Sequence, residues 1–117
     1  MKLTVYHNPR CRKSREAINY LENKGVSFNV IKYQEQSFDK NTLVKVLEKI
    51  EKKPSDILRK NEVLWKQEYA SKNLSEDQIL HLLVEQPKLI ERPIITFNDN
   101  GILARPIENL IEFLNKS

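Results

Sequence analysis

The segment HNPRCRKS, residues 7–14, holds the only cysteine of the chain among cationic and hydroxyl side chains. Cys11 follows the turn-forming stretch Asn8-Pro9-Arg10 and precedes a run with helical periodicity, so we expect it at the start of a helix. Helix N-terminal N–H groups and nearby cations stabilise a thiolate, which is the nucleophilic form of cysteine. A free cysteine is also commonly a small buried apolar residue. Position and neighbours alone therefore leave two interpretations of Cys11 open, a reactive nucleophile and an inert core residue.

Several side chains around Cys11 have the chemistry to stabilise a thiolate. They are the cations of Arg10, Arg12 and Lys13, the hydroxyl of Ser14 and the imidazole ring of His7. Taken singly, the serine and the histidine have simpler explanations, because a serine at a helix start commonly caps main-chain N–H groups and a histidine is often a surface residue. We interpret the second histidine, His81, as structural.

Three arginines in separate segments are candidates for binding an anion. Arg92 and Arg105 each precede a proline and each lies at an end of a predicted strand, and Arg59 follows an apolar pair in the middle of the chain. Guanidinium groups that converge from separate segments suit a tetrahedral oxyanion, because each donates two hydrogen bonds to adjacent oxygens. Any one of them alone is more often an exposed, salt-bridged arginine.

The predicted elements follow the order strand, helix, strand, then a helical stretch, then strand, strand, helix. The strands are predicted at 2–6, 26–32, 93–97 and 102–104, the first helix at 13–24, and the last helix from Pro106 onward. The stretch between the halves shows helical periodicity, with Ser75 and Gln78 forming a capping box and Pro87 ending a helix. The pattern βαβ…ββα predicts an α/β fold whose two halves are separated by a helical insertion.

Composition narrows the classes of protein. The chain has 117 residues, 39% of them hydrophobic, with 20 basic and 16 acidic residues and a net charge of +4. One cysteine excludes an internal disulfide and argues against a cysteine-based metal site, so we expect no metal. We expect a cytoplasmic protein without a membrane span, since neither a signal peptide nor an apolar run of about 20 residues is present. The absence of a basic stripe interleaved with aromatic residues argues against nucleic-acid binding.

Four separated motifs resemble a known family. HNPRCRKS, together with LRKN at 58–61, ERPII at 91–95 and ARP at 104–106, is similar to the glutaredoxin-dependent arsenate reductases of the ArsC type, which are related to Spx-type proteins. The likeness runs in order over nearly the whole chain. It implies a thioredoxin-like fold with a mixed four-stranded sheet, formed by one domain over residues 1–117 with a helical insertion at approximately 39–90.

The resemblance also implies a reaction and a site. The reaction converts arsenate and glutathione to arsenite, with glutathione as co-substrate, glutaredoxin as partner and no tightly bound cofactor. Cys11 matches the nucleophile, His7 and Ser14 match residues that tune the thiol, and the extra cation of Arg12 would add to their effect. The remaining matches are the oxyanion-binding Arg59, Arg92 and Arg105, the loop residue Asn8, and Pro93, which is expected to follow a cis peptide bond.

Two alternatives share the fold. An Spx-like regulator would bind RNA polymerase and sense oxidation through a Cys-x-x-Cys pair, and Ser14 in place of the second cysteine argues against that role. A monothiol protein would exchange disulfides or remove glutathione from other proteins, and it would have no evident need for three arginines.

Overall fold

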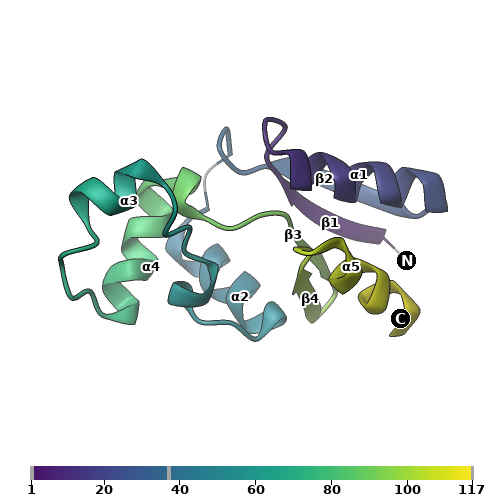
Figure 1. Ribbon diagram of the computed structural model, residues 1–117. Helices are drawn as coiled ribbons and strands as arrows, with labels where there is room; N and C mark the ends of the chain where they lie inside the picture. Colours follow the sequence, from purple (N-terminus) through teal and green to yellow (C-terminus); the bar gives the residue numbers. More distant parts are fainter. Residues whose placement is uncertain (1, 37, 117) are drawn as a thin grey trace. The chain divides into compact units, whose positions relative to one another are not determined.

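The computed structural model describes residues 2–36 and 38–116 (Figure 1). Packing contacts divide the chain into two units. The first unit comprises the residues up to Gln36 and those from Arg92 onward, and the second comprises the residues between them, as far as Glu91. The second unit coincides closely with the insertion expected at 39–90, and that the whole chain forms one domain stays a prediction.

The first unit contains a mixed four-stranded sheet. Its elements are β1 (Lys2–His7), α1 (Arg12–Lys24), β2 (Ser27–Lys32), β3 (Ile94–Phe97), β4 (Asn100–Leu103) and α5 (Ile107–Lys116). The strands are ordered β2-β1-β3-β4. β1 pairs with β2 in parallel, as a βαβ crossover requires, whereas the β1–β3 and β3–β4 pairs are antiparallel. The α/β fold class and the mixed sheet are therefore confirmed.

The hairpin and the last helix differ from the prediction by one or two residues. β4 begins at Asn100 rather than at residue 102, because the turn consists of Asn98 and Asp99 alone and Asn98 adopts the positive φ (54°) that such tight turns need. α5 begins at Ile107, not at Pro106. The Pro106 carbonyl instead accepts the first-turn hydrogen bond from the main-chain N–H of Asn109, at 3.0 Å.

The register of the strands gathers three predicted site residues at one end of the sheet. Ile94, the first residue of β3, pairs with the second-last residue of β1 and with the last residue of β4. His7 ends β1, Arg92 lies just before β3, and Arg105 lies just after β4. All three therefore lie at the end of the sheet where β1 delivers the chain to the loop that carries Cys11.

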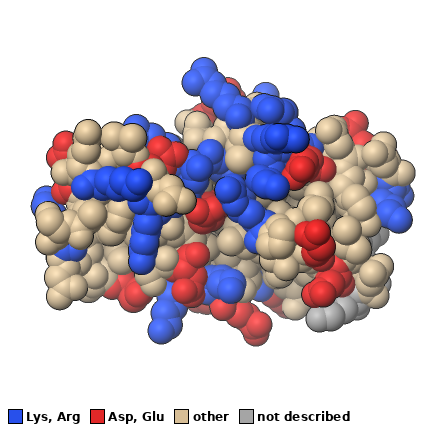
Figure 2. Space-filling model, viewed as in Figure 1, with Lys and Arg blue, Asp and Glu red and all other residues tan. Residues whose placement is uncertain are grey.

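An apolar core holds this unit together. α1 and α5 contact each other and pack on the same buried side chains of the sheet. The fully or almost fully buried members of this core are Leu3, Val5, Ala17, Leu21, Ile95, Ala104 and Leu110. On the surface, Figure 2 shows Lys and Arg side chains gathered where Figure 1 draws the β1–α1 loop and the start of α1.

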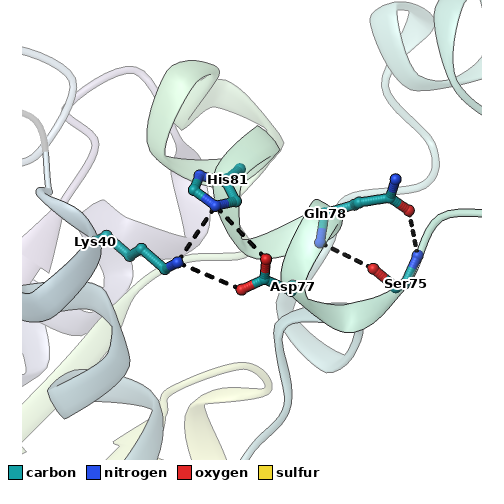
Figure 3. A network of polar contacts seen from close by, with 5 residues as sticks. All are labelled: Lys40, Ser75, Asp77, Gln78 and His81. Atoms are coloured by element: carbon teal, nitrogen blue, oxygen red, sulfur yellow. Dashed lines mark hydrogen bonds and ion pairs between the residues drawn. The ribbon is translucent and has the colours of Figure 1, made fainter.

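The second unit is helical. It comprises α2 (Lys40–Ile50), the 3₁₀ turn η1 (Pro54–Ile57), α3 (Val63–Glu68), α4 (Glu76–Glu85) and the 3₁₀ turn η2 (Pro87–Leu89). The predicted capping box is confirmed, since the Ser75 hydroxyl accepts from the Gln78 main-chain N–H (3.2 Å) and the Gln78 side chain accepts from the Ser75 N–H (2.8 Å) (Figure 3). α4 ends two residues before Pro87, as predicted. Among the described residues, no helix is long and apolar enough to cross a bilayer.

We expect Gly25→Ala to lower the free energy of unfolding by about 1 kcal/mol, because Gly25 ends α1 in the left-handed conformation (φ 69°) that disfavours a Cβ atom. No atom of the described residues lies within 4 Å of that Cβ, so the effect reports the backbone alone. Urea denaturation measures it. Gly25→Asn is the matched control and should recover part of the loss, because asparagine tolerates this conformation better. An alanine variant as stable as the wild type would contradict this account of the helix end.

Candidate active site

Asn8 shapes the loop that carries Cys11. The main-chain N–H of Cys11 donates to the Asn8 carbonyl (3.0 Å), which closes a four-residue turn. The Asn8 side-chain oxygen accepts from the N–H of Arg10 (3.0 Å), an arrangement typical of asparagine in turns. Asn8 is buried, and Cys11 stands immediately before the first residue of α1 in an extended conformation. The turn therefore places the sulfur-bearing residue at the N-terminus of the helix.

Ser14 fastens this loop to the first turn of α1. Its side chain is fully buried, and its hydroxyl accepts a hydrogen bond from the main-chain N–H of Asn8 (3.3 Å). The main-chain N–H of Ser14 is among the groups that lower the pKa of Cys11, and the action of its hydroxyl on the thiol stays a prediction. Ser14 thus contributes to the site through its backbone and through the position of the loop.

Two opposing effects set the acidity of the Cys11 thiol. Burial, the largest single influence, raises the pKa of Cys11, because a sheltered thiolate loses hydration. The main-chain N–H of Ser14, the guanidinium of Arg92 and the main-chain N–H of Lys13 together outweigh it, so that the pKa is lower than that of an ordinary thiol. The helix start and one arginine therefore favour the nucleophilic form of the cysteine.

Arg92 is the arginine that the structure brings to Cys11. It is only 8% exposed, and it both hydrogen-bonds to the thiol and stabilises its anion by charge. Its Nε and Nη1 atoms are buried without a hydrogen-bond partner in the described part of the chain. The peptide bond between Arg92 and Pro93 is cis, the geometry expected at this position. A buried guanidinium with unpaired N–H groups beside a thiol is suited to bind an incoming anion.

His7 is buried at the end of β1 rather than exposed. Its Nδ1 atom has no hydrogen-bond partner among the described residues. Burial lowers the pKa of His7, and the positive charges of Lys32 and Arg15 lower it further. The ring is therefore neutral at pH 7, so His7 supplies no positive charge for the thiolate.

The other three arginines of the predicted site differ from Arg92 in their surroundings. Arg105 is at the same end of the sheet, where its main-chain carbonyl accepts from the Asn109 side chain (3.2 Å). Arg59 belongs to the second unit, where its N–H donates to the Leu89 carbonyl (2.7 Å) and its guanidinium forms an ion pair with Glu62. Arg12 is exposed and is not among the groups that most affect the pKa of Cys11.

His81 lies outside the candidate site. It is exposed on α4, within 3.3 Å of the Lys40 ammonium and 3.6 Å of the Asp77 carboxylate (Figure 3). Ion pairs this exposed contribute little to stability. Within the described residues, no group of three or more histidine, cysteine or acidic side chains is arranged to hold a metal ion.

Comparison with known proteins assigns the family. The sequence profile of the ArsC family matches residues 6–113. An arsenate reductase of Neisseria meningitidis is 32% identical over 111 residues, which cover 93% of this chain and 95% of that protein. The uncharacterized protein YfgD of Escherichia coli is 36% identical over 115 residues, 97% of each chain.

Solved structures agree with the sequence relatives. The arsenate reductase from Vibrio cholerae superimposes with a TM-score of 0.88 at 37% identity, covering 96% of this chain and 97% of that one. A putative arsenate reductase from Yersinia pestis gives a TM-score of 0.86 at 34% identity, covering 94% and 98%. The chain belongs to the ArsC family and has its thioredoxin-like fold.

We expect Arg92→Met to raise the pKa of Cys11 and to slow its alkylation by iodoacetamide at pH 7, because methionine keeps much of the bulk and removes both the charge and the hydrogen bond. The measurement is the alkylation rate against pH. Arg12→Met is the control, since it removes an exposed cation that directly follows Cys11 in the sequence. If both variants shift the pH profile equally, general surface charge rather than Arg92 sets the acidity of the thiol.

The burial of neutral His7 predicts a stability that falls in acid. The folded state holds the pKa of His7 below the ordinary value of 6.5, so the unfolded chain binds the proton more readily. The contribution of neutral His7 to the free energy of unfolding is fully present above pH 6.5 and is lost as the pH falls below that value. We expect His7→Gln to flatten the decline of unfolding free energy between pH 7 and pH 5. Equal slopes for His7→Gln and the wild type would contradict this.

Proposed function

We propose that this protein reduces arsenate or a similar oxyanion, with the Cys11 thiolate as nucleophile and glutathione as the external reductant. The observation that carries the proposal is the buried Arg92 guanidinium, which contacts the thiol and has two further nitrogen atoms without partners among the described residues. Membership of a family that includes arsenate reductases supports the choice of substrate. We also propose a cytoplasmic location and no tightly bound cofactor.

The oxyanion would bind beside Arg92 and the N-terminus of α1. Arg92 donates to its oxygens, and the N-terminus of α1 favours a negative charge beside it. The Cys11 sulfur then attacks arsenic, a new S–As bond forms, and one oxygen leaves as water or hydroxide. Arg92 stabilises the charge on the remaining oxygens without having to reorient, since it is already buried in place.

Reduction needs two electrons and therefore two thiols. A glutathione thiol attacks the adduct, arsenite leaves with the electron pair, and Cys11 and glutathione remain joined as a mixed disulfide. The second sulfur must come from another molecule, because Cys11 is the only cysteine of this chain. Glutaredoxin would then release Cys11 by thiol–disulfide exchange, which regenerates the thiolate.

Two further arginines are proposed as oxyanion ligands. Arg105 lies at the same end of the sheet as Arg92, and its position is set by β4. Arg59 is proposed on the resemblance alone. Its ion pair with Glu62 engages one of the five guanidinium N–H groups, so that pairing and anion binding are chemically compatible.

The residue at position 14 argues against the Spx-like alternative. Such a sensor needs a second thiol three residues after the first, and the residue there is Ser14, whose hydroxyl is buried and hydrogen-bonded to the Asn8 N–H. The hydrogen bond from Asn8 explains the serine at this position, because it holds the loop to the first turn of α1. A polymerase-binding regulator that senses oxidation through a cysteine pair is therefore a poorer fit than a single-thiol enzyme.

We expect Cys11→Ser to lower arsenate reduction at least about a thousandfold, because a serine hydroxyl is not ionised at neutral pH. The assay couples glutathione and glutaredoxin to NADPH consumption, and circular dichroism checks that the variant is folded. Turnover near that of the wild type in a folded variant would refute the nucleophilic role of Cys11.

Loss of an arginine should act on binding. We expect Arg92→Ala and Arg105→Ala to weaken arsenate binding about tenfold to a hundredfold each, since hydrogen bonds to charged groups contribute about 1.5–3 kcal/mol. The measurement is the arsenate concentration that protects Cys11 from iodoacetamide by half, with each rate referred to that variant's own unprotected rate. Lys24→Ala, at the far end of α1, is the control. Unchanged protection in both arginine variants would place the oxyanion site elsewhere.

A further inference from the structure

The segment around Cys11 carries exposed positive charges beyond the groups that stabilise its thiolate. Four of the six residues from 10 to 15 are basic and none is acidic. All four basic side chains are exposed, in contrast to Arg92. They belong to the region around the β1–α1 loop and the start of α1 where Figure 2 shows Lys and Arg side chains gathered. A concentration of one sign of charge next to a reactive group favours encounter with oppositely charged reactants.

Two of these four cations are already engaged within the first unit. The Lys13 ammonium lies 3.6 Å from the Glu16 carboxylate, and Arg15 Nη1 donates to the Pro9 carbonyl at 3.0 Å. Arg10 and Arg12, which flank Cys11 directly, form no ion pair with any described residue. These two guanidinium groups are the ones available to a reactant.

Neither Arg10 nor Arg12 is among the groups that most lower the pKa of Cys11. The buried Arg92 and the N–H groups of Ser14 and Lys13 account for the main stabilisation of the Cys11 thiolate. A small oxyanion held by Arg92 would also be sheltered, because Arg92 is 8% exposed. Exposed arginines on either side of Cys11 in the sequence instead suit a larger anionic molecule. Such a molecule would bring its own sulfur to Cys11 and leave its charged groups at the surface.

We propose that Arg10 and Arg12 form a binding site for the carboxylate groups of a small thiol or disulfide of the glutathione class, and so select anionic over neutral partners for exchange with Cys11. The proposal rests on the proposed function in one respect, that Cys11 is the nucleophile. It adds what that function leaves open, namely which residues recognise the external thiol. Charge-assisted pairing between guanidinium and carboxylate supplies the recognition.

The exchange step is balanced without a further reactant. The Cys11 thiolate attacks one sulfur of a disulfide, an S–S bond forms between them, and the original S–S bond breaks. The second half leaves as a thiolate and takes the bonding electron pair, so Cys11 is oxidised and the disulfide is reduced. When the carboxylates of the attacked disulfide lie against Arg10 and Arg12, the reacting sulfur is held near Cys11.

The test compares two disulfides that differ in charge. The rate of mixed-disulfide formation at Cys11 is measured with oxidised glutathione, which is anionic, and with bis(2-hydroxyethyl) disulfide, which is neutral. In the double variant Arg10→Gln/Arg12→Gln we expect the rate with oxidised glutathione to fall about threefold to tenfold, the size of effect that exposed ion pairs produce, with the neutral rate unchanged. Lys24→Gln is the matched control and should change neither rate.

A second measurement needs no variant. In the wild type, 0.5 M NaCl should lower the ratio of the anionic to the neutral rate, because salt screens exposed charges. The proposal is overturned if the double variant slows both disulfides equally, if it slows neither, or if the ratio in the wild type is insensitive to salt. Since no arsenate is present, failure here is distinguishable from failure of the proposed reductase activity, which the coupled arsenate assay reports separately.

Discussion

The stabilisation of one buried thiolate is the interaction on which the rest of the site depends. Burial works against the charged form of Cys11, and the positive groups that compensate must be fixed close to the sulfur. Main-chain N–H groups of α1 can do this only if the chain enters the helix at Cys11, which the turn at Asn8 ensures. Arg92 can do it only if the start of β3 lies at the same end of the sheet as the end of β1, which the strand register ensures.

Arg92 links the resting site to its proposed ligand. A buried guanidinium whose Nε and Nη1 groups have no partner in the described part of the chain is unfavourable by itself, because such donors lose the hydrogen bonds they made to water. The thiolate offsets part of that penalty. An oxyanion that accepts from the remaining groups would remove more of it, so binding would relieve an unfavourable feature of the free protein rather than merely add contacts. A site of this kind is stabilised by its ligand.

Much of the fold and part of the candidate site could be predicted from the sequence. The predictions that differ from the structure do so for physical reasons. Alternation and helical periodicity located the strands and helices, since both record which side chains face the core. Neighbours in sequence were a poorer guide to neighbours in space. Arg12 directly follows Cys11 yet is exposed, whereas Arg92 is distant in sequence and contacts the thiol. Nor could residue type show that Ser14 acts on Cys11 through its backbone, or that His7 is buried and neutral, because both depend on tertiary packing.

The positive charges near Cys11 thus fall into a buried and an exposed group, and the degree of burial determines how each group can act. A buried charge such as Arg92 acts through short, fixed contacts that salt screens little, which suits the ionisation of a thiol and the binding of an oxyanion. Exposed charges such as Arg10 and Arg12 are screened and flexible, so they contribute little at equilibrium but act on approaching anions at longer range. With a single cysteine, the protein must meet an external thiol in every catalytic cycle of the proposed reaction. The exposed pair can therefore influence which thiol arrives while the buried pair of sulfur and guanidinium stays unchanged.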